Sequence, residues 1–339
     1  MSIYNIHFCE YEELEDLQRF LHNYWRKNHV LSYSKELFEF QYKKENASYY
    51  SFVIGRNNLT DEIDGVYGFI ESQKYDPSHE IPNMGWGAIW KVRDDVRNKE
   101  IGKLGLKMLN FILKHSSIIE FAALGISSIH KDLALSLNCH VGELNHYYII
   151  NRDISNFKIA FNPSYSCDIN NSKILEIKES SDVSNLKIKN NINIFKNIPY
   201  FINRYQKHPF FKYIFWKIYD LDTCIGVFAV RKILIQNSCI FRIIDFIGDI
   251  PSHSTILPSI QTILKSENAE YVDCLNYGLD INLFLQWGFC LAPQNNTVVI
   301  PEHLDPLEHK YVPLEFECMS DMPLVIFKGD GDQDRPNKV

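Results

Sequence analysis

The fold is decided by a stretch near the end of the first third of the chain, WKVRDDVRNKEIGKLG, residues 90–105. A strand pattern ends here, a polar turn follows, and an amphipathic helix pattern begins. The first backbone N–H groups of a helix lack partners within the helix, and the helix dipole adds partial positive charge there. Gly102 lets a ligand approach the backbone closely, and Arg97, Lys99 and Lys103 surround it with positive charge. The stretch therefore predicts a site for an anion such as a pyrophosphate.

On both sides of this stretch, the periodicity of the first half of the chain predicts the order β-α-α-β-β-β-α-β-α-β. The expected strands are 2–8, 49–55, 65–71, 83–92, 120–126 and 145–150, and the expected helices are 10–25, 34–43, one starting near 101, and 128–137. Strand 83–92 alternates regularly, which predicts that Trp86 and Trp90 share one face of the sheet.

The second half repeats this order loosely, after a boundary near 152–172 that is rich in loop residues. The expected strands are 174–179, 212–219, 224–231, 239–249, 270–277 and 324–328, and the expected helices are 183–205, 254–264 and 280–287. A chain of 339 residues exceeds what one core usually serves. The sequence therefore predicts an α/β (α+β) protein with two tandem domains, 1–155 and 170–339, each a mixed, mostly antiparallel twisted sheet flanked by helices.

Charge and hydropathy exclude several classes of function. The net charge of -7 and the pI of about 6.0 argue against a general nucleic-acid or membrane-surface binder. No run approaches the roughly 20 apolar residues that a membrane span needs, and no signal peptide is recognised. We expect a cytoplasmic monomer or homodimer. The C-terminal aspartates begin like a calcium loop, but the required Gly and Glu are missing, so no metal is expected.

The motif and the order of elements resemble the acyl-CoA-binding core of the GNAT superfamily of N-acyltransferases. Arg97 and Gly102 match the ends of its Arg/Gln-x-x-Gly-x-Gly/Ala pattern, while Glu100 replaces the first glycine. The resemblance implies that acyl-coenzyme A is a co-substrate and that the strand after this helix splays away to admit its pantetheine arm. The residues it implies for acyl-CoA binding are Trp90, Val92, Arg97, Asn98, Lys99, Glu100, Ile101, Gly102, Lys103, Leu104 and Ser128.

The second half lacks this motif. Residues 249–255 stand where the phosphate-binding turn would be, and they carry neither a glycine pair nor a basic side chain. Asp249 would repel a pyrophosphate. We therefore expect one acyl-CoA site, in the first half, and a second half that shapes the acceptor pocket.

The sequence offers three candidates for the catalytic groups, Asp245, Tyr148 and His146. The superfamily's tyrosine acid has no counterpart, because its position near Leu135 is apolar; His146 and Tyr148 are candidate substitutes. Asp245, expected on one strand face with Phe241 and Ile243, is a candidate base for the acceptor amine, since a buried carboxylate needs a partner or a task. A purely structural ion pair explains Asp245 equally well.

The whole chain resembles the tandem sugar N-acyltransferases of surface-polysaccharide pathways, which include enzymes that acylate dTDP-3-amino-3,6-dideoxygalactose. Residues 142–151 and 329–337 carry this resemblance. It implies acetyl-CoA or 3-hydroxybutyryl-CoA as donor and a dTDP-linked amino sugar as acceptor, for O-antigen, capsule or S-layer glycans. Residues considered for the acceptor are Trp86, Asp249, Asp330, Asp332, Asp334 and Arg335, although core packing and a solvated tail are the plainer explanations for the tryptophan and the C-terminal run.

Two other functions stay open at this point. A peptidoglycan transferase that uses aminoacyl-tRNA has the same tandem fold, but the acidic charge and the lack of a heptad run count against it. Glu100 and the missing tyrosine also fit a GNAT-like core that binds or assembles without catalysis.

Overall fold

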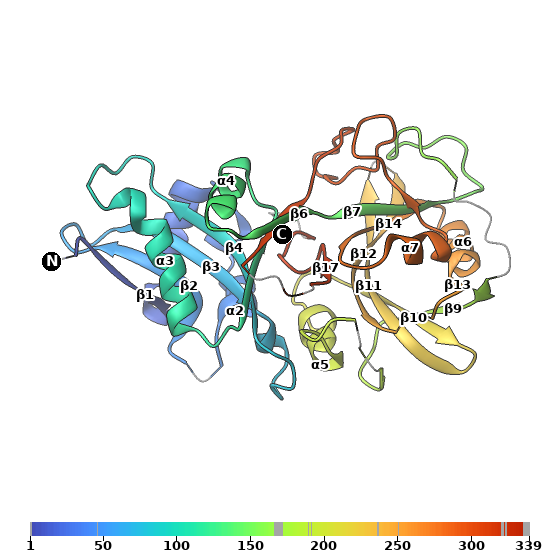
Figure 1. Cartoon of the computed structure of the whole chain (residues 1–339), viewed down its shortest axis with the longest axis horizontal. Helices are drawn as coiled ribbons and strands as arrows, with labels where there is room; N and C mark the ends of the chain where they lie inside the picture. Colours follow the sequence, from blue (N-terminus) through green and yellow to red (C-terminus); the bar gives the residue numbers. More distant parts are fainter. Residues whose placement is uncertain are drawn as a thin grey trace.

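The computed structural model describes residues 2–45, 47–165, 172–188, 190, 192–235, 237–249, 251–319, 322 and 324–334. These residues form two large twisted sheets that lie side by side, each with helices packed on it (Figure 1). A further pair of short strands, β8 (Lys173–Ile174) and β13 (Ser254–Thr255), lies at one end of the second half.

The first sheet has seven strands. Across the sheet they are β1 (Tyr4–Glu10), β2 (Tyr49–Asn57), β3 (Ile63–Glu71), β4 (Met84–Val92), β5 (Glu120–Leu124), β16 (Glu315–Cys318) and β6 (His140–Glu143). All neighbours are antiparallel except β4 and β5. The second sheet runs in the order β15 (Cys290–Leu291), β7 (Asn145–Ile150), β14 (Ala269–Tyr277), β12 (Ser238–Gly248), β11 (Thr223–Ile235), β10 (Ile214–Asp220) and β9 (Glu176–Ser180), and β17 (Ile326–Phe327) pairs with β14.

The two halves exchange one strand each. Strand β7 was expected to complete the first sheet, but it lies between β14 and β15 of the second sheet. In return, β16 from the second half fills the place between β5 and β6 of the first. Figure 1 shows β6 and β7 running on from one half of the molecule into the other. This exchange ties the halves together through backbone hydrogen bonds.

The helices of the first half lie where the periodicity placed them. They are α1 (Leu14–Phe20), α2 (Lys35–Tyr42), α3 (Ile101–His115) and α4 (Ser128–Ser136). The Ser34 hydroxyl accepts a hydrogen bond from the Leu37 amide, which confirms the expected cap of α2. Leu104 and Met108 of α3 pack into a core on one face of the sheet, whereas α1 and α2 bury their apolar residues on the other.

In the second half the helices are α5 (Ile198–Phe201), α6 (Leu257–Ser266) and α7 (Ile281–Trp287). The helix expected over 183–205 is wrong for most of its length. The Asn190 side chain donates hydrogen bonds to the carbonyl oxygens of Asn193 and Lys196, so a side chain satisfies the backbone in place of helical bonds. Only the segment from Ile198 onward is helical, with Asn197 as its cap.

Strand β4 of the first sheet and strand β12 of the second each contain a one-residue bulge. In both strands the bulge places a side chain on the opposite face of the sheet from the one that the sequence predicted. In β4 the register shifts at Ala88, so Trp86 faces the cluster shared with α1 and α2 while Trp90 faces α3. In β12 the shift falls at Ile244, so Asp245 does not share the face of Phe241 and Ile243. A bulge inserts one residue and thereby reverses the alternation beyond it.

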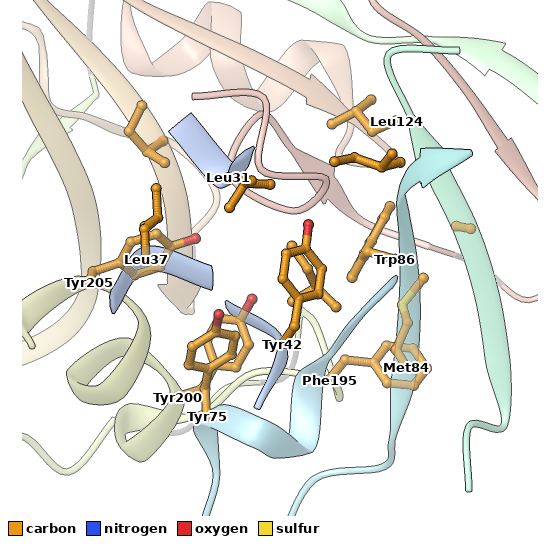
Figure 2. Packing of buried hydrophobic residues seen from close by; sticks show 14 of the residues in the cluster. Leu31, Leu37, Tyr42, Tyr75, Met84, Trp86, Leu124, Phe195, Tyr200 and Tyr205 are labelled. Carbon is orange, nitrogen blue, oxygen red and sulfur yellow. The ribbon is translucent and has the colours of Figure 1, made fainter. Parts of the chain in front are cut away.

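One hydrophobic cluster spans both halves. Leu37, Tyr42 and Trp86 from the first half belong to the same cluster as Tyr200 and Tyr205 from the second, and Figure 2 shows these side chains among the buried residues of the cluster. All five side chains are buried. The halves therefore share a core as well as strands.

Candidate functional site

The first sheet opens between β4 and β5. The parallel ladder runs from Met84 opposite Glu120 to Gly87 opposite Ala123 and ends there. The bulge at Ala88 follows at once, and β4 continues to Val92 while β5 ends at Leu124. The two strands therefore separate, and β4 presents a free stretch of backbone that leads toward the start of α3.

Helix α3 begins as the sequence predicted, with one addition. The Asn98 side-chain oxygen accepts hydrogen bonds from the Glu100 and Ile101 amides, both at 2.9 Å, so it occupies two of the backbone donors at the start of the helix. At Gly102, a Cβ built on the backbone meets no heavy atom within 4 Å. The space beside Gly102 is thus open to a ligand.

The charges around this helix start are mostly basic at the surface. Lys99 and Lys103 are exposed, while the Arg97 guanidinium donates to the Val96 carbonyl in its own loop at 3.1 Å. The Glu100 carboxylate, which replaces the family glycine, forms an ion pair with Lys107 at 2.7 Å. The Lys107 ammonium therefore offsets the negative charge of Glu100, which would otherwise disfavour an anion at this position. Leu104, in contrast, points into the core, so its side chain does not face the site.

A cluster of aromatic and titratable side chains lies between α3 and α4 beside the opening. The Trp90 ring stacks on Tyr67 with centroids 4.7 Å apart, and the His130 ring of α4 meets Trp90 edge-on at 5.0 Å. His130 Nε2 lies 2.8 Å from Glu317 Oε1 on the exchanged strand β16, which leaves Nδ1 outside this pair. The buried Tyr67 hydroxyl has no hydrogen-bond partner among the described residues.

The second sheet has the corresponding opening, and the C-terminal segment fills it. The parallel ladder of β12 and β14 ends at Ile243 opposite Cys274, and the bulge at Ile244 follows. Beyond this point β17 pairs with the edge of β14 that β12 no longer occupies, and the Gly329 amide donates to the Ile244 carbonyl at 3.0 Å. A Cβ at Gly329 would lie 2.7 Å from the Ile244 side chain, so the fit is tight.

The turn that precedes α6 is also closed. It contains β13, which pairs with β8, and the Thr255 hydroxyl accepts a hydrogen bond from the Leu257 amide. Asp249 is exposed at the start of this turn, and its amide donates to the Ile225 carbonyl. Within the described residues, the opening between β12 and β14 is therefore filled by this chain's own backbone, unlike the opening between β4 and β5.

A buried ion cluster anchors the C-terminal segment. Lys196 Nζ lies 2.7 Å from Asp245 Oδ1 and 2.7 Å from Asp330 Oδ1, and all three residues are almost fully buried. The Tyr205 hydroxyl donates to Asp245 Oδ2 at 2.7 Å. Burial raises the pKa of Asp245 to about 6, although the Lys196 ammonium lowers it. The predicted base Asp245 and the predicted acceptor ligand Asp330 are therefore brought together, around a lysine that the sequence analysis missed.

This cluster gives a pH-dependent prediction. A carboxyl with a pKa of about 6 when folded and 3.8 when unfolded stabilises the fold below pH 3.8, and that contribution is lost as the pH rises toward 6. We expect the unfolding free energy of the wild type, minus that of Asp245→Asn, to fall as the pH rises through this window. Urea unfolding of both proteins over pH 4 to 7 measures the difference. A difference that does not change with pH would contradict the raised pKa.

The remaining C-terminal aspartates also have partners. The Asp332 carboxylate accepts from the Gln41 side chain of α2, and the Tyr213 hydroxyl donates to Asp334 Oδ2 at 2.5 Å. Beyond them, the Gln333 side chain donates to the Leu124 carbonyl at 3.1 Å, at the end of β5 in the first sheet. The segment thus runs from the second opening to the first. The predicted ligand Arg335 lies outside the described residues.

The predicted catalytic pair on β7 belongs to the second sheet because of the strand exchange. The Tyr148 hydroxyl, on a buried side chain, bonds to the Ser164 hydroxyl at 2.8 Å. His146 Nε2 lies 2.9 Å from Asp273 Oδ2, and Arg242 contacts the same carboxylate at 2.7 Å. Burial lowers the pKa of His146, despite the opposing effect of Asp273. Their catalytic roles stay predictions.

The other predicted residues are placed as follows. Ser128 is the exposed first residue of α4, directly after the cap Ser127. Trp86 is buried in the cluster between the halves, where it packs as a core residue. His130 and Glu317 were missed because they lie 187 positions apart, and no local pattern links them.

No protein-family model matches the sequence, and no curated protein sequence does. Among solved structures, a conserved Enterococcus faecalis protein of unknown function, named a probable N-acyltransferase, superposes with a TM-score of 0.54 at 8% identity. A GCN5-related N-acetyltransferase from Anabaena variabilis gives 0.51 at 11% identity. Each comparison covers 93% of this chain and 72% of the other.

At such identities these likenesses establish the fold, while the chemistry has to be argued from residues. The chain has the predicted fold class: two tandem GNAT-like domains, each with a mixed, mostly antiparallel sheet flanked by helices. In the described part of the chain, no helix combines the length and hydrophobicity that a membrane crossing needs. The same residues contain no group of three side chains suited to hold a metal ion.

Proposed function

We propose that this chain is an N-acyltransferase that moves an acyl group from coenzyme A to an amine, with a single acyl-CoA site in the first domain. The observation that carries the proposal is the opening of β4 from β5 at the Ala88 bulge, directly before the exposed start of α3. The free backbone of β4 offers hydrogen bonds to the amide groups of a pantetheine arm. Gly102, Lys99 and Lys103 offer space and charge for its phosphates.

The corresponding opening of the second domain supports one site rather than two. There β17 and Gly329 take up the hydrogen bonds that a pantetheine arm would use. The resemblance to tandem sugar N-acyltransferases makes a dTDP-linked amino sugar the acceptor we favour, with an acetyl or 3-hydroxybutyryl donor. Glycan assembly in the cytoplasm is the matching role.

The reaction needs no covalent enzyme intermediate. The neutral acceptor amine attacks the thioester carbonyl, the nitrogen of the adduct loses one proton to water, and the C–S bond breaks to give an amide and a CoA thiolate. Backbone N–H groups of β4 beyond the bulge polarise the carbonyl. His130 supplies the proton that the departing thiolate takes up, because the contact with Glu317 holds its ring beside the opening.

The role of His130 gives a kinetic prediction. We expect His130→Ala to lower kcat by about 100-fold, the lower end of general-acid effects, with little change in the KM for acyl-CoA. Glu317→Gln keeps the shape of the partner but weakens its hold on the His130 ring, so it should lower kcat less than His130→Ala does. The matched control is His115→Ala at the exposed end of α3. A kcat for His130→Ala within twofold of the wild type would exclude His130 as the acid.

The function itself is tested by release of free thiol. Acetyl-CoA or 3-hydroxybutyryl-CoA is mixed with the protein and a dTDP-linked amino sugar, and thiol and amide product are both measured. Thermal unfolding with CoA reports binding separately, because ligand at about 100 times its dissociation constant adds roughly 2.7 kcal/mol of stability. Binding of CoA without transfer would redirect the search to another acceptor. No shift with CoA would favour a GNAT-like binding module.

A further inference from the structure

A cavity of about 310 Å³ lies where the chain crosses between the two sheets. Its walls come from the link between β6 and β7, from Leu275 of β14, and from residues 291–300 and 311–314. Its size is near the lower end of the roughly 300–1,000 Å³ usual for small-molecule sites, which suits a single ring with its substituents.

The cavity lies at the same edge of the first sheet as the opening between β4 and β5. Strands β5 and β6 both pair antiparallel with β16, so they run parallel to each other and end at the same edge. The Gly125 amide, after β5, donates to the Glu315 carbonyl, and the Leu144 amide, after β6, donates to the Leu314 carbonyl. Two strand spacings of about 4.8 Å therefore separate the end of β5 from the cavity wall.

The lining of the cavity is mostly apolar with a few polar groups, and it contains an acidic side chain but no Lys or Arg among the described residues. Glu143, Asn145, His146, Gln294 and Tyr311 are its polar members. None of the described residues that line it is Lys or Arg, so the cavity offers no counter-charge to a phosphate. The Tyr311 hydroxyl donates to the Glu143 carboxylate, and both side chains line the cavity.

His146 is held in a fixed orientation at this wall. Asp273 accepts hydrogen bonds from Arg242 and lies 2.9 Å from His146 Nε2. Burial alone would raise the pKa of Asp273, but Arg242 and His146 outweigh it and lower the pKa to about 2. A permanently ionised Asp273 fixes the Nε2–H tautomer of neutral His146, so its Nδ1 is a hydrogen-bond acceptor.

We propose that this cavity binds the amine-bearing ring of the acceptor, a hydroxylated and uncharged or cationic ring such as an amino sugar, while any phosphates of the acceptor lie outside it. Glu143 pairs with the ammonium form, and Asn145, Gln294 and the His146 ring take the hydroxyl groups. The apolar walls cover the faces of the ring. The inference rests on the proposed function, because it assigns the second substrate of that reaction.

The test uses free D-glucosamine, D-glucose and acetyl-CoA as separate probes of the full chain. Saturation-transfer NMR detects the sugars, and thermal unfolding detects acetyl-CoA. Ala292 lines the cavity, so Ala292→Phe adds a ring within it; Leu234→Phe adds the same ring on an exposed strand and is the control. We expect glucosamine to bind the wild type and Leu234→Phe, and to bind Ala292→Phe at least about tenfold more weakly.

A second variant protects the test against misfolding of the first. Glu143→Gln keeps the size of the side chain, and it should remove most of the preference for glucosamine over glucose. Glucosamine that binds all variants equally, or that does not bind the wild type, would overturn the cavity assignment. The thermal shift with acetyl-CoA decides the proposed function separately, because the cavity variants leave the α3 site unchanged.

Discussion

Methionine in place of Lys196 should lower the free energy of unfolding by about 3–5 kcal/mol at pH 7, the usual cost of removing one partner from a buried ion pair. The substitution leaves Asp245 and Asp330 facing each other without a counter-charge, in a site where neither carboxylate reaches solvent. Lys196 Nζ also lies 5.5 Å from the Phe327 ring, a contact that the methionine does not replace. Urea unfolding at pH 7 measures the loss.

Two comparisons separate this effect from a general loss of a lysine. Lys196 precedes the helical segment that begins at Ile198, and Lys207 follows it. Lys207→Met removes an exposed ammonium and should change stability by less than about 0.5 kcal/mol. The cost of Lys196→Met should also shrink as the pH approaches 4, because protonation of Asp245, whose pKa is already raised to about 6, relieves the repulsion. A loss below 1 kcal/mol at pH 7 would mean that the cluster relaxes or admits water.

Tryptophan in place of Gly102 should weaken acyl-CoA binding by at least about 100-fold, which corresponds to about 2.8 kcal/mol. A side chain at this position enters open space beside the start of α3, so the fold should tolerate it. The indole ring would occupy the space in which we propose that a phosphate of the ligand binds. Calorimetric titration with CoA measures affinity, and thiol release measures transfer. Both should fall together.

The controls for this variant lie on the same helix. Gly102→Ala adds only a Cβ in open space and should keep the fold and most of the affinity. Asn110→Trp places the same large ring at an exposed position further along α3, away from its start. Unchanged CoA affinity in Gly102→Trp would place the acyl-CoA site elsewhere and withdraw the proposed function.

Features that depend on neighbours along the chain could be predicted from the sequence. The amphipathic period of α3, the cap of α2 and the glycine beside an exposed helix start follow from interactions within a few residues. The order of elements and the missing motif in the second half also pointed to a tandem fold with one phosphate-binding turn. These inferences needed no knowledge of which strands pair.

The pairings between distant segments become visible only in the folded molecule. The exchange of β7 and β16 moved His146 and Tyr148 into the second sheet and brought Glu317 to His130, 187 positions away. Two bulges reversed the faces expected for Trp90 and Asp245. The physical reason is that a strand offers the same backbone hydrogen bonds to any partner, so side-chain packing across the whole molecule selects which partner it takes.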